Sequence, residues 1–160
     1  MALKTGDKLV HKTHGVGIIS GIETKNYGGG PQDYYLLKIC STGLIVRFPK
    51  GAESAVVRDL VTNREIDKVY SILKSPSNVY SVVWNRRKKE LSEKIKSGSL
   101  YEMAEVLRDL SRLKSEKELS FGEKEMLEKA KERLVDEISA ATASECSRVE
   151  EQLNQILLPH

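Results

Sequence analysis

Residues 55–73, AVVRDLVTNREIDKVYSIL, contain the point at which one local sequence pattern gives way to another. Thr62 and Glu65 have the spacing of a capping box, in which the hydroxyl accepts a first-turn amide and the carboxylate reaches back to the cap. The apolar residues that follow recur every three or four positions, at Ile66, Val69, Tyr70 and Leu73. This spacing predicts an amphipathic helix, which Ser75-Pro76 should end. We therefore expect a helical domain to begin here.

The sequence before this point alternates as β-strands do. Its apolar runs are KLVHK at 8–12, VGIISGIETK at 16–25, DYYLLKIC at 33–40 and LIVRFP at 44–49, before a last run, AVV, at 55–57. Turn-forming residues separate these runs, among them the Gly28-Gly29-Gly30-Pro31 cluster. Gly15, Gly17 and Gly21 should permit sharp bending of the strands. The pattern predicts a small antiparallel, partly closed β-barrel.

Helical periodicity continues from residue 61 to the end of the chain. Two further capping boxes are predicted, Ser99 with Glu102 and Ser120 with Glu123. The apolar faces comprise Met103, Val106, Leu107, Leu110 and Leu113, then Leu127, Ala130, Leu134 and Ile138, then Val149, Leu153, Ile156 and Leu157. We expect an α+β protein of two domains, a β-barrel at 1–60 and a compact all-α domain of four or five helices at 61–160.

The composition limits the classes of protein to which this chain can belong. The chain has 160 residues, of which 39% are hydrophobic and 31% charged. It contains no run of the roughly 18–20 apolar residues that span a bilayer, and MALKTGDKLV lacks a secretory core. We therefore expect a cytoplasmic protein without a membrane partner. Cys40 and Cys146 have no paired spacing, and His11 and His14 lack neighbouring ligands, so we expect neither a disulfide nor a metal site.

Catalytic motifs are not expected either. The glycine triplet at 28–30 leads into Pro31 and a strand, whereas a phosphate loop leads into a helix, so a hairpin loop is the better interpretation. The sequence has no Walker lysine, G-x-S-x-G or H-E-x-x-H pattern, and its three histidines offer little for acid–base catalysis. The sequence therefore predicts a protein that is not an enzyme and needs no cofactor.

Positive charge is concentrated in one segment that we expect to be a helix, residues 81–96, ended by Ser97-Gly98. Residues 81–97 carry six Lys/Arg against two Asp/Glu, a net charge of +4, whereas residues 98–160 carry nine against fourteen, a net charge of −5. The basic residues adjoin the only tryptophan, Trp84, and include Arg86, Arg87, Lys88 and Lys89. Such a surface can neutralise DNA phosphates, while an indole can stack on a base or wedge into a groove.

The same helix has a purely structural interpretation. Trp84, Leu91 and Ile95 fall at i, i+7 and i+11, which is the spacing of a buried stripe. A Lys/Arg run on a helix is commonly a solvated face. The spacing does not separate these interpretations, nor does it distinguish DNA from RNA or an acidic protein as the partner.

Longer stretches of the chain resemble a known family. They are GDKLVHKTHGVGIISGIET at 6–24, YYLLKI at 34–39, LIVRFP at 44–49, VWNRRKKELSEKIKSGSLYEMAEVLRDL at 83–110 and ELSFGEKEMLEKAKERLVDEIS at 118–139. Together they resemble the CarD/CdnL family of bacterial RNA polymerase-binding transcription regulators over about residues 3–140. The combination of VWNRR, AEVLRDL and LSxGEKxML is the most specific part of this resemblance.

The resemblance implies a non-enzymatic regulator. Its Tudor-like N-terminal domain, shared with the transcription-repair coupling factor, would dock on the RNA polymerase β subunit through the residues that match Lys25 and Arg47. Its helical domain would contact promoter DNA through Trp84 at the upstream edge of the bubble and stabilise the open complex. The matched backbone contacts are Arg87 and Lys89. Lysine at position 25 keeps the charge of the family's arginine but loses its bidentate fork.

We further expect a monomer that is associated with the nucleoid through RNA polymerase. Two other functions fit the residues. One is a general nucleic-acid-binding accessory protein that reads nucleic acid with its barrel, although the adjacent Tyr34 and Tyr35 should face opposite ways and Arg47 stands nearly alone in its strand. The other is a protein-binding adaptor, which suits the acidic C-terminal half.

Overall fold

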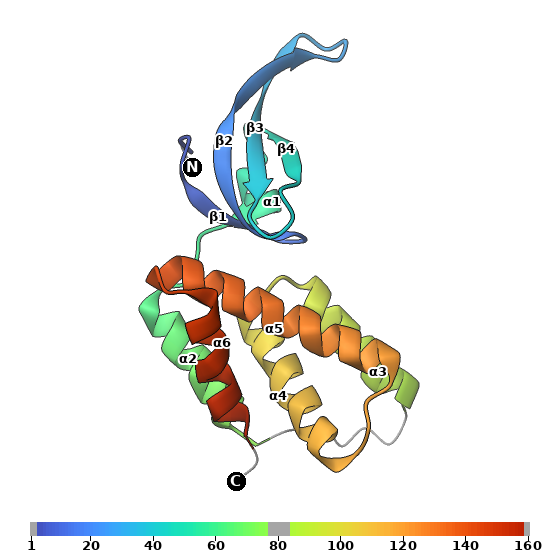
Figure 1. The fold of residues 1–160 in the computed structure, drawn as a ribbon. Helices are drawn as coiled ribbons and strands as arrows, with labels where there is room; N and C mark the ends of the chain where they lie inside the picture. Colours follow the sequence, from blue (N-terminus) through green and yellow to red (C-terminus); the bar gives the residue numbers. More distant parts are fainter. Residues whose placement is uncertain (1–2, 77–83, 159–160) are drawn as a thin grey trace. The chain divides into compact units, whose positions relative to one another are not determined.

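The computed structural model describes residues 3–76 and 84–158, and within these the side chains of all residues except 84–87. The chain forms two compact units, residues 1–60 and 61–160 (Figure 1). The first is an antiparallel sheet with one short helix, and the second is all helical. The predicted α+β fold class is therefore confirmed. None of the helices that the structure describes is long and apolar enough to span a membrane.

The first unit is a five-stranded sheet in the order β4-β3-β2-β1-β5, with every pair antiparallel. Its strands are β1 (Lys8–His11), β2 (Gly15–Asn26), β3 (Pro31–Ile39), β4 (Ile45–Pro49) and β5 (Val57–Arg58). The glycine triplet lies in the β2–β3 hairpin, as predicted, where Gly28 and Gly30 have positive φ angles. The apolar run at 55–57 is divided between a one-turn helix, α1 (Glu53–Val56), and β5, because only its last residue pairs with β1.

The bend of the long β2 strand depends on two irregular positions. At Gly17 the backbone passes so close to β3 that an added Cβ would lie 2.7 Å from Leu37 Cγ. Between Ile19 and Gly21 the register with β3 shifts by a bulge, which increases local twist. The sheet packs around a core of buried side chains, namely Leu3, Leu9, Ile19, Tyr35, Leu37, Ile39, Phe48 and Val57.

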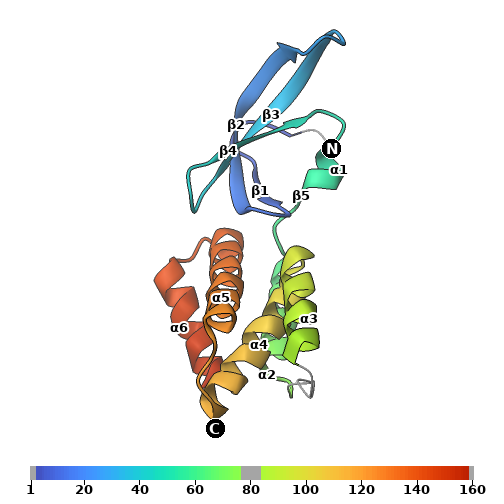
Figure 2. The same ribbon diagram turned by 90° about the vertical axis from the view of Figure 1, so that its right-hand side faces the viewer.

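The second unit contains five helices in the part of the chain that the structure describes. They are α2 (Asn63–Lys74), α3 (Trp84–Lys96), α4 (Leu100–Glu116), α5 (Phe121–Thr142) and α6 (Cys146–Leu157). Helix α4 contacts α2, α3, α5 and α6, and Figure 2 shows α3 and α4 from the side. The predicted apolar faces form the core, with Val106, Leu107, Leu134, Ile138 and Leu153 almost fully buried. The predicted start of α3 at residues 81–83 lies outside the described residues.

Two of the three predicted capping boxes are confirmed. Thr62 with Glu65 and Ser120 with Glu123 make both reciprocal hydrogen bonds. The box predicted for Ser99 is wrong, because its side chain makes no capping hydrogen bond. Its backbone amide instead donates to the Ser97 hydroxyl at 3.2 Å, within the tight turn that joins α3 to α4.

Buried charged side chains hold both ends of α2, which the apolar periodicity did not predict. Before the helix, the Val61 amide donates to a carboxylate oxygen of the buried Glu137 at 2.9 Å. After it, Arg108 donates through Nη1 to the Ser75 hydroxyl at 2.8 Å. Arg108 Nε also lies 2.9 Å from Asp109 Oδ1, and each of these residues is only 5% exposed. Helix α2 is thus fixed to α4 and α5 by polar contacts as well as by its apolar face.

Replacing Gly17 by Ala should destabilise the sheet by about 1–3 kcal/mol, the usual cost of overpacking a core. The new methyl would meet the branched carbon of Leu37 rather than the far end of a flexible side chain. Gly21→Ala is the matched control, because a Cβ there has no neighbour within 4 Å. Hydrogen–deuterium exchange of the β2 and β3 amides measures the difference. Equal exchange in the two variants would contradict the close approach.

Replacing Arg108 by Met should destabilise the helical unit by about 3–5 kcal/mol, because it removes the cation from a buried ion pair. Arg112→Met is the control, since Arg112 is partly exposed and donates to the Leu73 carbonyl at 3.3 Å. Its loss should cost about 1 kcal/mol. Urea unfolding followed by the helical circular dichroism signal compares them. If Arg108→Met is no more harmful than the control, the end of α2 does not depend on this pair.

Candidate polymerase- and nucleic-acid-binding surfaces

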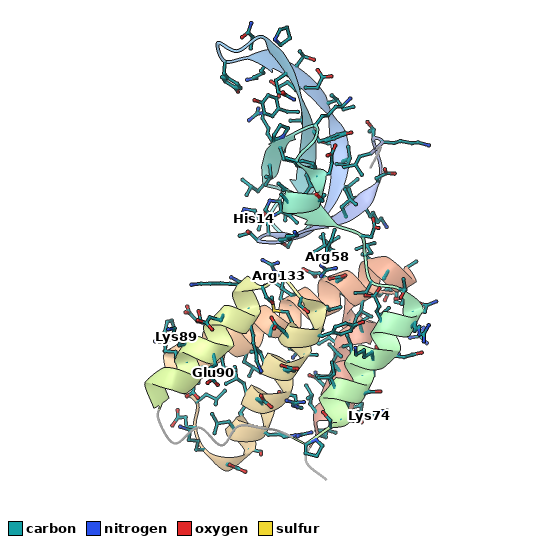
Figure 3. The ribbon with its side chains drawn as sticks, turned by 180° about the vertical axis from the view of Figure 1, so that it is seen from behind. His14, Arg58, Lys74, Lys89, Glu90 and Arg133 are labelled. Atoms are coloured by element: carbon teal, nitrogen blue, oxygen red, sulfur yellow. The ribbon has the colours of Figure 1, made fainter. Side chains whose placement is uncertain are left out.

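Helix α3 separates its apolar residues from its basic ones. Leu91 and Ile95 are buried in the helical core at 4% and 8% exposure, so the structural interpretation holds for these two positions. Lys88 and Lys89 are exposed to solvent, and Lys89 is labelled on α3 in Figure 3. The solvent side of α3 therefore carries at least two cations close to the start of the helix.

The remaining predicted DNA-binding residues form the first turn of α3. The backbone of Trp84, Arg86 and Arg87 is helical, so the structure places them immediately before Lys88. Their side chains lie outside the described residues. Whether the Trp84 indole is buried or contacts DNA therefore stays a prediction.

Phe121 is an exposed aromatic residue that the sequence interpretation did not single out. It opens α5 and is 77% exposed. The next residue, Gly122, lies beside α3, because a Cβ built on it would be 3.8 Å from Lys88 Nζ. The start of α5 is the positive end of its helix dipole, which the capping carboxylate of Glu123 partly offsets. We call Lys88, Lys89 and Phe121 the α3–α5 surface.

The two predicted polymerase-binding residues lie on different strands and are joined by an acidic residue that the sequence did not indicate. Glu23 Oε1 is 3.2 Å from Lys25 Nζ, and Glu23 Oε2 is 3.0 Å from Arg47 Nε. The hydrogen bonds from Arg47 and Lys25 lower the pKa of Glu23, and the carboxylate in turn raises the pKa of Arg47. The structure thus brings the predicted residues together as an alternating charge cluster.

This cluster lies on a partly apolar outer face of the sheet. Tyr34 pairs with Glu23 across β2 and β3, and opposed residues point to the same face. The Tyr34 ring meets the Tyr27 ring edge-to-face with centroids 5.9 Å apart, and Tyr27 is 72% exposed. Ile45, two residues before Arg47 and hence on the same face, is 50% exposed. Exposed aromatic and aliphatic groups around charges are typical of a protein-binding surface.

Metal ligation finds no support among the described residues. They contain no group of three or more His, Cys, Asp or Glu side chains that could hold an ion. His11 has a structural role, since its Nδ1 accepts the amides of Thr13 and His14 in the β1–β2 turn. Cys40 and Cys146 are free and exposed.

Comparisons with known proteins assign both units to one family. Residues 3–61 match the model of the CarD-like/TRCF RID domain, and residues 68–154 match that of the CarD C-terminal domain. A Bacillus subtilis (strain 168) protein described as "Putative transcription factor YdeB" is 34% identical over 134 residues, which are 83% of this chain and 88% of the relative. The solved structure of CdnLNt from Myxococcus xanthus shows 31% identity and a TM-score of 0.34, over 39% of this chain and 90% of its own.

The Glu23 carboxyl should titrate below the usual glutamate value of 4.5. Because its folded-state pKa is lowered, the stabilisation from its ion pairs is present at neutral pH and is lost as the pH falls through that lowered pKa. An NMR titration of the Glu23 carboxyl carbon measures this value. Arg47→Ala should raise it toward the usual value by removing its largest cause. An identical Glu23 pKa in that variant would contradict the ion pair.

Proposed function

The chain belongs to the CarD family, and from this membership we propose that it is a non-enzymatic transcription regulator acting on RNA polymerase at promoters. The observation that carries the proposal is the match of two family models, in order, to the two units of one chain. The sheet unit docks on the polymerase β subunit, and the helical unit contacts promoter DNA at the upstream edge of the bubble. The protein acts as a monomer in the cytoplasm, where polymerase and nucleoid are found.

The outer face of the sheet supports the docking half of this proposal. Lys25 and Arg47 place two cations around Glu23, so the cluster has a net positive charge that suits an acidic partner. The neighbouring Tyr27 and Ile45 are well exposed and can bury apolar area when a partner covers them. Charge complementarity would guide the encounter, and the apolar contacts would lengthen the lifetime of the complex.

The α3–α5 surface supports the DNA-binding half. Lys88 and Lys89 face solvent on α3, and Arg86 and Arg87 precede them on the same helix, so four cations can approach DNA phosphates within one or two helical turns. In this proposal Trp84 inserts at the bubble edge, while the exposed Phe121 lies near the DNA backbone. The basic residues position the protein and the indole distinguishes opened DNA from duplex.

Differential binding explains how such a contact acts on transcription. A side chain that interacts better with unpaired bases than with duplex DNA shifts the closed–open equilibrium toward the open complex. Stacking of an aromatic residue on a base contributes about 1–3 kcal/mol, and about 1.4 kcal/mol changes an equilibrium tenfold. One well-placed indole therefore suffices to change promoter opening without any catalysis.

The barrel is poorly suited to the alternative role of nucleic-acid reader. Tyr35 is only 4% exposed and packs against Phe48 in the core, so it offers no ring for stacking. The Glu23 carboxylate also offsets part of the charge of Arg47 and Lys25 on the outer face. These observations favour a protein partner for the sheet.

Trp84→Ala should shorten the lifetime of the polymerase–promoter open complex about tenfold, since it removes the stacking of one ring. Polymerase binding should be unchanged, because the docking surface lies on the other unit. A competitor challenge of preformed open complexes measures the lifetime. An unchanged lifetime would argue against insertion of the indole.

Arg47→Glu is the complementary variant. It should abolish recruitment to the β subunit while leaving the helical unit folded, because it places an anion opposite an acidic partner. Co-purification with core polymerase measures recruitment, and helical circular dichroism checks folding. Recruitment that survives this charge reversal would place the docking surface elsewhere on the molecule.

A further inference from the structure

We infer that Glu23 is a positioning residue for polymerase docking: it holds the Arg47 side chain across the outer face of the sheet, ready for a partner carboxylate. The inference rests on the proposed function, because it concerns the same surface. The new element is that Glu23, an acidic residue of the same chain, holds the docking arginine in place before the partner binds.

Strand order makes the contact between these two residues long-range. Glu23 lies on β2 and Arg47 on β4, with β3 between them. Neighbouring strands are about 4.8 Å apart, so the two side chains must extend toward each other over β3 to place Arg47 Nε 3.0 Å from the Glu23 carboxylate. Arg47 pairs with Leu36, and Glu23 pairs with Tyr34, so the ion pair spans β3 diagonally.

The hydrogen bond from Arg47 to Glu23 leaves the rest of the guanidinium available for a partner. Glu23 accepts from Nε, whereas a planar arginine fork carries four further N–H donors on its two Nη nitrogens. Arg47 donates no other hydrogen bond to the described residues, and its side chain is 51% exposed. A partner carboxylate can therefore bind the Nη edge in a bidentate manner while Glu23 keeps its own contact.

Pre-organisation of the Arg47 side chain matters because Arg47 lies at the edge of the sheet. Strand β4 is an edge strand of the sheet. Without Glu23, the long Arg47 side chain would therefore sample many rotamers in solvent. Ordering a flexible side chain at an interface reduces affinity, and fixing it beforehand recovers that loss. Arg47 is held in one direction before any partner arrives.

The negative charge of Glu23 works against docking, since it repels a partner carboxylate. Two features reduce this repulsion. Lys25 Nζ lies 3.2 Å from the other carboxylate oxygen, so the cluster keeps a net positive charge, and repulsion between exposed charges is weakened by water and salt. We therefore expect the positioning effect to outweigh the repulsion at physiological salt.

Two substitutions at position 23 separate these effects. Glu23→Gln removes the charge but keeps an amide oxygen that can accept from Arg47 Nε, whereas Glu23→Ala removes both. If Glu23 positions Arg47, Glu23→Ala should weaken polymerase binding, whereas Glu23→Gln should keep most of the affinity. Competition by the carboxylate predicts that both variants bind more tightly than the parent.

The test is the affinity of the full-length chain for core RNA polymerase, measured by biolayer interferometry at physiological salt. Glu23→Ala should raise Kd about three- to tenfold through lost pre-organisation, and Glu23→Gln should stay within about twofold of the parent. In a double-mutant cycle, Glu23→Ala should have a clearly smaller effect in an Arg47→Ala background, because Glu23 acts mainly through Arg47. Thr24→Ala is the control, since successive strand residues point to opposite faces.

Tighter binding by both Glu23 variants would overturn the inference, as would a Glu23→Ala effect that persists undiminished without Arg47. If Arg47→Ala itself leaves Kd unchanged, the docking proposal fails together with the inference; if Arg47→Ala weakens binding but Glu23→Ala does not, the inference fails alone. A readout without polymerase is the NMR order parameter of the Arg47 Nε–H bond, which should fall in Glu23→Ala and not in Glu23→Gln. An unchanged value in Glu23→Ala would also overturn the inference.

Discussion

Helix α2 is held at its start by the carboxylate of Glu137 and at its end by the guanidinium of Arg108, both buried. These contacts lock α2 onto α4 and α5. Helix α3 is fixed to the same core by Leu91 and Ile95, so the chain is anchored on both sides of the segment that leads to the basic helix. Burying a guanidinium is costly unless its charge and hydrogen bonds are matched, and Asp109 provides that match. Helix α3 packs on α4 and α5, the same two helices to which these contacts attach α2.

Regular features of the fold were predictable because they repeat along the chain. The change from alternating to helical periodicity at Thr62, the two confirmed capping boxes and the buried faces of α4 and α5 all follow from local spacing. The failed prediction was also local: Ser97 competes for the amide of Ser99 once the α3–α4 turn has closed. The Arg108 contacts could not be predicted from periodicity, since a charged residue on an apolar face ordinarily points to solvent.

The candidate sites were predictable only in part, and for a physical reason. Family resemblance singled out Arg47 and Lys25, but their link through Glu23 crosses an intervening strand and depends on the register of three strands. No spacing in the sequence reports such a contact. Phe121 was likewise missed, because an aromatic residue after a helix cap is as compatible with a core as with a surface. The first turn of α3 was predicted from its charges, and its DNA-binding role is a proposal based on family membership.

Carrying both surfaces on one chain has a thermodynamic consequence. In the proposed function, binding of the sheet unit to polymerase would hold the helical unit near promoter DNA at a high effective concentration, so a weak DNA contact would be enough. Permanganate footprinting of the upstream bubble edge, in polymerase–promoter complexes with and without the protein, tests the proposed DNA contact. We expect stronger and longer-lasting reactivity of the unpaired bases when the protein is present. Identical reactivity and decay with and without bound protein would contradict this expectation.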